Sequence, residues 1–221
     1  MEILDEKQLR VIGCLIEKSI VTSDQYPLTL NALTNACNQK SSRDPVMSLS
    51  QGEVQHTIRE LEGKHLVRTE ENFKSRAEKY VQRFCNTRYS ELQFSPAELA
   101  VVCLLFLRGA QTPGELKSRS GRLHTFADNA EVVEALNALK NRETGALVVK
   151  LPRTPGRKDS EYMHLFSGPI DIDAYAADVQ ARAPASSSPR RSDIAALTER
   201  VDRLEDELAE LKKRLGEDPA A

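Results

Sequence analysis

The chain has 221 residues, of which 40% are hydrophobic and 29% are charged, and its formal net charge is −2. This composition is ordinary for a globular protein, and the length allows one large domain or two small ones. A net charge so close to zero excludes a general electrostatic attraction to nucleic acid, so any basic surface must be local.

The first part of the chain predicts three amphipathic helices. The first begins at Asp5, a capping residue, in the segment DEKQLRVIGCLIEKS. Its apolar residues recur on one helical face: Leu9, Ile12, Leu15 and Ile16. The second helix is expected in TLNALTNAC, from Thr29, and the third in QGEVQHTIRELEG, from Gln51.

Two β-prone runs follow the third helix. They are HLVRT, from His65, and YVQRF, over residues 80–84, in which the two aromatic side chains fall on one face of a strand. The polar and basic segment EENFKSRAEK lies between them. Three helices and then a hairpin is the winged-helix order, in which the apolar faces share one small core.

The segment between the second and third helices, residues 38–50, is unusually long. A helix-turn-helix normally has a turn of about 3–4 residues at this point. Long loops are often functional, so its polar residues are candidates. These candidates are Asn38, Gln39, Lys40, Ser42 and Arg43. The alternative is a packed loop whose polar side chains cap the neighbouring helix ends.

The same four blocks recur in the second part of the chain. SPAELAVVCLLFLRG, from Ser95, matches the first helix, and its apolar face is Leu99, Val102, Leu105 and Phe106. TPGELKSRS from Thr112 matches the second helix, and NAEVVEALNALKN from Asn129 matches the third. In the fourth block, YMHLF over residues 162–166 matches YVQRF, and the β-prone run ALVVKLPR, from Ala146, precedes it as HLVRT precedes YVQRF. Four blocks in the same order predict a tandem repeat.

Several longer motifs carry a resemblance to a known family. VIGCLIEKS, QYPLTLNALTNACNQKSSRDPVM, KYVQRFCN and RGAQTPGEL are similar to the signatures of the YceH family of bacterial proteins. The resemblance covers residues 3–168. It implies tandem winged helices in a cytoplasmic bacterial protein. It implies no function, so no catalytic or binding residue is carried over from it.

The C-terminal part changes in composition and then in periodicity. ARAPASSSPRR, over residues 181–191, has the bias of a flexible linker. Apolar residues then fall at alternating spacings of three and four: Ile194, Leu197, Val201, Leu204, Leu208, Leu211 and Leu215. This heptad pattern, with Leu at every d position, favours a parallel two-stranded coiled coil and therefore a homodimer. The alternative is an amphipathic helix that folds back on its own domain.

We therefore expect a mainly α fold with small β-hairpins (α+β), built from tandem winged-helix (helix-turn-helix) domains and a C-terminal coiled-coil helix. The expected divisions are a first winged-helix domain over residues 1–90, a second over 91–180, a flexible linker over 181–192, a coiled-coil helix over 193–216 and a disordered tail over 217–221.

No motif in the chain predicts enzyme chemistry. The cysteines, Cys14, Cys37, Cys85 and Cys103, form no CxxC pair, and no phosphate-binding glycine loop, HExxH or GxSxG motif is present. We expect no catalytic residue, no metal and no cofactor. The N-terminus lacks a signal-peptide core, and the longest apolar run, residues 99–107, is too short to span a bilayer. We therefore expect a cytoplasmic protein.

DNA binding is the default function of a winged helix, in which the third helix enters the major groove and the wing contacts the backbone. The first repeat offers residue types suited to both roles. They are Gln51, Gln55, His56 and Arg59 on the third helix, with Lys74, Arg76, Lys79 and Arg83 in the wing. The second repeat fits less well, because Asp128, Glu131 and Glu134 would repel phosphate.

Two functions of different class therefore stay open. The first is a dimeric DNA-binding protein that acts as a transcriptional regulator, whose partners are a second copy of itself and double-stranded DNA. The second is a non-enzymatic protein–protein adaptor, similar in architecture to the small subunits of bacterial chromosome-condensing complexes. The basic wing favours the first. The near-neutral charge and the acidic third helix of the second repeat favour the second.

Overall fold

The computed structural model describes residues 2–72, 75–88, 90–153, 158–182, 200, 203–205 and 207–208. Over these residues the fold is mainly α, with small antiparallel sheets, as predicted. Residues 1–178 form one compact unit and residues 179–221 a second. Among the helices described, none is both long and apolar enough to cross a membrane.

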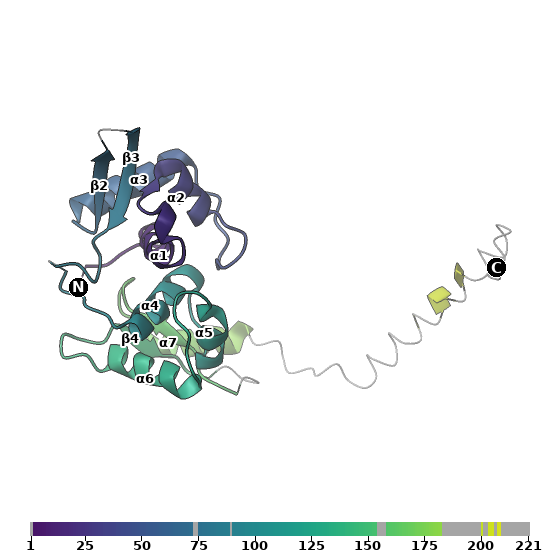
Figure 1. The fold of residues 1–221 in the computed structure, drawn as a ribbon. Helices are drawn as coiled ribbons and strands as arrows, with labels where there is room; N and C mark the ends of the chain where they lie inside the picture. Colours follow the sequence, from purple (N-terminus) through teal and green to yellow (C-terminus); the bar gives the residue numbers. More distant parts are fainter. Residues whose placement is uncertain are drawn as a thin grey trace. The chain divides into compact units, whose positions relative to one another are not determined.

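The first lobe contains the first copy of the repeat (Figure 1). Its helices are α1 (Glu6–Val21), α2 (Leu30–Cys37) and α3 (Gln51–Gly63), with a short 3-10 helix, η1 (Ser23–Gln25). Its strands are β1 (Leu28–Thr29), β2 (Val67–Asn72) and β3 (Ser75–Gln82). The three predicted helices are therefore confirmed.

Capping side chains fix where the main helices begin. The side chain of Asp5 accepts from the backbone N–H of Gln8, and the Gln8 side chain accepts from the Asp5 N–H. Ser50 and Glu53 form the same reciprocal pair at the start of α3. Each pair satisfies two backbone donors that the first helical turn leaves without an intrahelical partner.

The sheet of the first lobe has the strand order β1–β3–β2. Val67 pairs with Gln82, Thr69 with Tyr80, and Asn72 with Ser75. The two long strands therefore extend through most of EENFKSRAEK, which the sequence pattern placed between the strands. The expectation was wrong because the cross-strand ladder continues through polar residues, which strands tolerate on a solvent-facing side.

The second lobe repeats the order of the first. It contains α4 (Pro96–Arg108), α5 (Pro113–Ser120), α6 (Asn129–Lys140), β4 (Val148–Lys150) and β5 (Tyr162–His164). An isolated bridge joins Gln111 to Tyr162, at the position where Leu28 of β1 pairs with Tyr80 in the first lobe. The repeat thus includes a third strand position that the sequence patterns did not predict.

The two lobes share a core. Leu4 N–H donates to the carbonyl oxygen of Phe166 at 2.8 Å, although the two residues lie at opposite ends of the unit's sequence. Phe84 of the first lobe packs edge-on against Phe106 and Phe166 of the second, with ring centroids 5.5 and 5.2 Å apart. The lobes therefore pack directly on each other, a point that the sequence left open.

Two further segments bear on the predicted tail. An unpredicted helix, α7 (Ile172–Arg182), ends within the segment assigned to the linker. Most of the predicted coiled coil lies outside the described residues, including Ile194, Leu197, Val201, Leu211 and Leu215. Leu204 and Leu208 are helical, and their side chains are 56% and 55% exposed. The coiled coil stays a prediction.

Candidate nucleic-acid interface

Helix α3 has one buried face and one exposed face. Val54, Ile58 and Leu61 are buried in the core of the first lobe. On the opposite side, Gln51, His56 and Arg59 are exposed and Gln55 is half-buried. Residues four apart lie on the same side of a helix, so Gln51, Gln55 and Arg59 form a continuous stripe. The structure therefore brings the candidate helix residues together on one surface.

The polar side chains of the stripe, and His56 beside it, differ in how firmly they are held. Gln51 Nε2 donates to Asn31 Oδ1 of α2 at 3.2 Å, and His56 Nε2 lies 3.4 Å from Glu60 Oε1. Within the described residues, the side chains of Gln55 and Arg59 make no hydrogen bond or ion pair. These two side chains are therefore available to an external partner.

The carboxylates of α3 are all engaged inside the first lobe. Glu53 pairs with Lys7 at 2.8 Å, and this contact with Lys7, together with Ser50, lowers the pKa of Glu53 to about 2. Glu60 accepts from Gln8 Nε2 at 3.3 Å, and Glu62 accepts from the backbone N–H of Thr69 at 3.0 Å. Their negative charge is thus partly offset by neighbouring donors.

The β2–β3 hairpin lies beside α3 (Figure 1) and presents a cationic outer face. Because side chains alternate along a strand, Lys79, Val81 and Arg83 lie on one side, and buried Tyr80 lies on the other. Across the ladder Arg68 is opposite Val81, and Glu70 is opposite Lys79. Arg68 is ion-paired with Glu70. Among the described side chains, three cations and one carboxylate therefore share this face, with Arg83 at its edge, one residue past the end of β3.

The remaining wing candidates are described less fully. Lys74 lies outside the described residues, and of Arg76 only its position in β3 is described. Arg68 belongs to the outer face but was not among the sequence candidates. Arg68 is identified by the pairing register of β2 against β3. This register cannot be predicted before the exact ends of the hairpin are known.

The long loop between α2 and α3 is tied to the lobe by its own polar side chains. Asn38 Nδ2 donates to the carbonyl of Leu49 at 2.7 Å, and Asn38 Oδ1 accepts from the Leu49 N–H at 2.8 Å. Gln39 Oε1 lies 3.5 Å from Lys18 Nζ. Of the five loop candidates, Lys40 and Ser42 are the exposed ones.

Arg43 is the central residue of this loop. Its side chain is fully buried and holds both carboxylate oxygens of Glu17, with Nη2 2.7 Å from Oε2 and Nη1 3.0 Å from Oε1. Arg43 Nε also donates to the carbonyl of Ala36 at 3.0 Å. Although burial alone would raise the pKa of Glu17, the hydrogen bonds and charge of Arg43 lower it. Arg43 is therefore a packing residue of the loop.

The second lobe presents a different surface at the corresponding helix. The carboxylate of Glu131, in the first turn of α6, accepts from the backbone N–H of Ala127 at 2.7 Å and lies 2.9 Å from His124 Nε2. Asp128 caps the helix, and Glu134 is exposed. The cations of α5 are occupied, since Lys117 donates to the Ala127 carbonyl and Arg119 to Gln111 Oε1. This end of the second lobe is acidic.

Comparison with known proteins gives consistent matches over most of the chain. The profile of the family described as "Protein of unknown function, DUF480" matches residues 4–157. A UPF0502 protein of Vibrio vulnificus (strain CMCP6) is 53% identical over 207 residues, 93% of each chain. UPF0502 proteins of Cronobacter sakazakii and Shewanella woodyi are 50% and 53% identical, and each match covers 94% of this chain and 92% and 95% of theirs.

Proposed function

The chain belongs to the DUF480 family, whose description assigns no activity, and from its own architecture we propose that it is a non-enzymatic winged-helix DNA-binding protein that regulates transcription. Membership agrees with the bacterial family that the sequence resembles. The DNA contacts are assigned to the first lobe, through helix α3 and the outer face of the β2–β3 hairpin.

The winged-helix assignment rests on the order and pairing of the elements. In the first lobe three helices precede a hairpin, and β1, which lies between α1 and α2, pairs with β3 of that hairpin. In the second lobe the Gln111–Tyr162 bridge occupies the matching position. The same connectivity in both lobes supports a tandem arrangement of one supersecondary unit.

One observation carries the DNA-binding proposal. Gln55 and Arg59, on the outer stripe of α3, have no hydrogen bond or ion pair among the described residues, and the cationic face of the adjacent hairpin belongs to the same lobe. Gln and Arg side chains can hydrogen-bond base edges in the major groove, and Lys and Arg on a wing can contact phosphate. Of the carboxylates of α3, Glu53 is ion-paired and Glu60 and Glu62 accept hydrogen bonds within the lobe, which reduces their repulsion of DNA.

We assign dimerisation to the C-terminal heptad segment. Leu204 and Leu208 are helical and more than half exposed, and apolar side chains at such positions are stabilised by a partner helix. A parallel coiled coil would join two copies of the first lobe, and two-fold symmetric proteins of this kind read two half-sites.

The second candidate function is the protein–protein adaptor. The observation that favours it is the acidic start of α6, where Asp128, Glu131 and Glu134 stand at the position that α3 uses in the first lobe. Such a surface suits a basic protein partner better than a phosphate backbone.

The test is fluorescence anisotropy of the full chain with labelled random-sequence duplex DNA, titrated over a range of salt. The variant is Arg68→Ala with Lys79→Ala, and the matched control is Lys140→Ala with Lys150→Ala, two exposed cations of the second lobe. We expect binding that falls steeply with salt. Loss of two phosphate contacts should reduce the log–log slope by about 2 in the first variant only.

Two results would overturn parts of this proposal. Absence of binding at low salt would contradict the DNA-binding function, and the protein–protein adaptor would then be the function to test. Equal weakening by both double variants would mean that DNA is attracted by general charge, and the assigned wing would then be wrong.

A further inference from the structure

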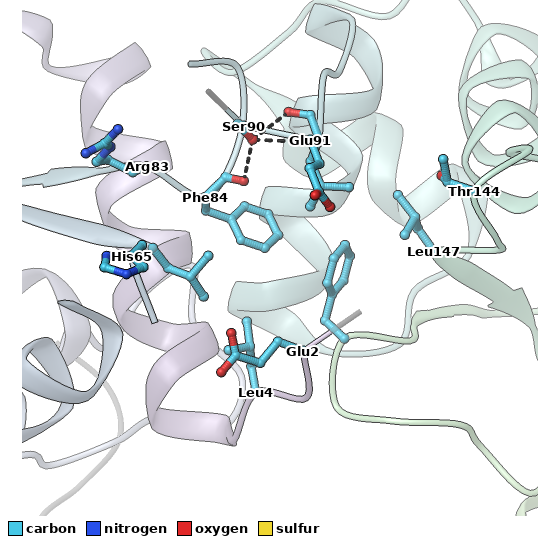
Figure 2. Close-up of a pocket in the computed structure, with 12 residues that line it drawn as sticks. Glu2, Leu4, His65, Arg83, Phe84, Ser90, Glu91, Thr144 and Leu147 are labelled. Atoms are coloured by element: carbon cyan, nitrogen blue, oxygen red, sulfur yellow. Dashed lines mark hydrogen bonds between the residues drawn. The ribbon is translucent and has the colours of Figure 1, made fainter. Parts of the chain in front are cut away.

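A cavity of about 400 Å³ lies at the junction of the two lobes (Figure 2). Its lining comes from the N-terminal segment, the start and end of the β2–β3 hairpin, the connection between the lobes and the second lobe. This volume falls within the range of about 300–1,000 Å³ that is typical of small-molecule sites, and such sites are frequent where domains meet.

The inner lining of the cavity is apolar. Leu4, Phe84, Leu147 and Phe166 line it, and each of these side chains is buried in the fold. Phe84 and Phe166 lie edge to face, with ring centroids 5.2 Å apart. Figure 2 shows the Phe84 ring in the middle of the group, between the residues of the two lobes. A hydrocarbon group seated here would contact both lobes.

The rim is polar and carries opposite charges on its two sides. Arg83 and His65 lie on one side, and Glu91 and Thr144 on the other (Figure 2). Glu2 also lines the cavity, and its carboxylate lies 3.5 Å from Lys64 Nζ. Within the described residues, the half-buried Arg83 guanidinium makes no hydrogen bond or ion pair. Over the part of the chain that the structure describes, Arg83 is therefore the rim cation without an internal partner.

We propose that this cavity binds a small apolar monocarboxylic acid, with the carboxylate on Arg83 and the hydrocarbon body against Phe84, Leu147 and Phe166. A guanidinium and a carboxylate can form two parallel charge-assisted hydrogen bonds, which fixes the orientation of the ligand. The carboxylates of Glu2 and Glu91 on the rim disfavour a dianion such as a phosphate monoester. A ligand bound in this way contacts both lobes at their interface.

The probe is 4-phenylbutyrate, and its neutral counterpart is 4-phenylbutanamide. Binding to the full chain is followed by NMR of ¹³C-labelled leucine methyl groups, up to about 10 mM ligand. We expect the methyl signals of Leu66 and Leu147 to shift, and the dissociation constant of the acid to be lower than that of the amide. Arg83→Gln should weaken binding of the acid by about tenfold and leave the amide unchanged, because only the acid uses the charge.

Two further variants complete the experiment. Thr144→Trp fills the rim from an exposed position and should abolish binding of both compounds, whereas Lys150→Gln, an exposed cation elsewhere in the second lobe, should change neither. Unchanged melting temperatures would show that the variants are folded. The proposal is overturned if neither compound shifts Leu66 or Leu147, if acid and amide bind equally, or if Arg83→Gln weakens both alike.

Discussion

Gly13 of α1 lies directly against Leu107 of α4: a β-carbon on Gly13 would lie 2.9 Å from Leu107 Cδ2 and 3.1 Å from Phe106 Cβ. The carbonyl of Gly13 also accepts from Cys103 Sγ at 3.5 Å. Gly13 and Cys103 occupy equivalent positions of the repeat, 90 residues apart. The first helices of the two lobes therefore meet at matching points, and the absence of a side chain at Gly13 permits their close approach.

Replacing Gly13 by alanine should destabilise the protein, although alanine is the better helix former. The added methyl group would overlap Leu107 in a packed core, and overpacking of this kind costs about 1–3 kcal/mol. Denaturant unfolding of the full chain measures the change. Gly63→Ala is the control, because Gly63 ends α3 and a β-carbon there would meet nothing within 4 Å. It should be neutral or slightly stabilising. A Gly13→Ala variant as stable as the control would contradict the close packing.

The repeat was predictable from sequence, but the packing of the lobes was not. Helical periodicity and capping residues identify each helix because they act within a few residues. Residues 100–107 of α4 are all buried, since α4 packs on α1 as well as on its own lobe. A helix that is apolar on all sides is predicted to be buried, but its sequence does not show which element packs against it. The sequence therefore predicted two domains and could not predict their shared core.

The ion pair of Arg43 and Glu17 should be a large contributor to stability. Arg43→Met would leave the Glu17 carboxylate, whose side chain is 13% exposed, without its main partner. Breaking a buried pair from one side costs about 3–5 kcal/mol. Lys7→Met removes one partner of the Lys7–Glu53 pair, whose side chains are 49% and 44% exposed, and should cost far less, because solvent screens an exposed ion pair. Urea unfolding of both variants decides the matter. Equal losses would contradict the structural role of Arg43.

Arg43 also shows why the candidate sites were predicted unevenly. A charged residue in a polar loop is normally solvated, and sequence alone does not reveal that Glu17, 26 residues earlier, lies beside it. The exposed stripe of α3 was predictable because helix periodicity assigns each residue to a face. The outer face of the hairpin needed the register of β2 against β3, so Lys79 and Arg83 were predicted and Arg68 was missed.

His164 should make stability depend on pH. Its side chain is 3% exposed and packs against Phe106, and burial lowers its pKa from 6.5 to about 4. Between these values the unfolded chain binds more protons than the folded one. Stability is therefore full above about pH 6.5 and falls by about 3 kcal/mol as the pH drops towards 4.

The contribution of His164 is isolated by comparing the pH dependence of stability in the wild type and in the variant His164→Leu. Unfolding free energies of both proteins are measured from pH 7 to pH 4.5. The value for the wild type should fall relative to that for the variant as the pH drops, because only the wild type has the buried imidazole. The Glu17 carboxylate titrates in both proteins and so cancels from the difference. Parallel curves over this range would show that the imidazole does not resist protonation in the folded state.

The heptad segment should set the oligomeric state. Leu204 and Leu208 occupy adjacent d and a positions, and replacing both by glutamate would place like charges at the centre of a coiled coil. Light scattering after size exclusion should give twice the chain mass of 24.7 kDa for the wild type and a single chain mass for the variant. Arg203→Glu changes a neighbouring residue at an outward position and should stay dimeric. A monomeric wild-type chain would contradict the predicted dimer. A double variant that stays dimeric would show that Leu204 and Leu208 do not join the two copies.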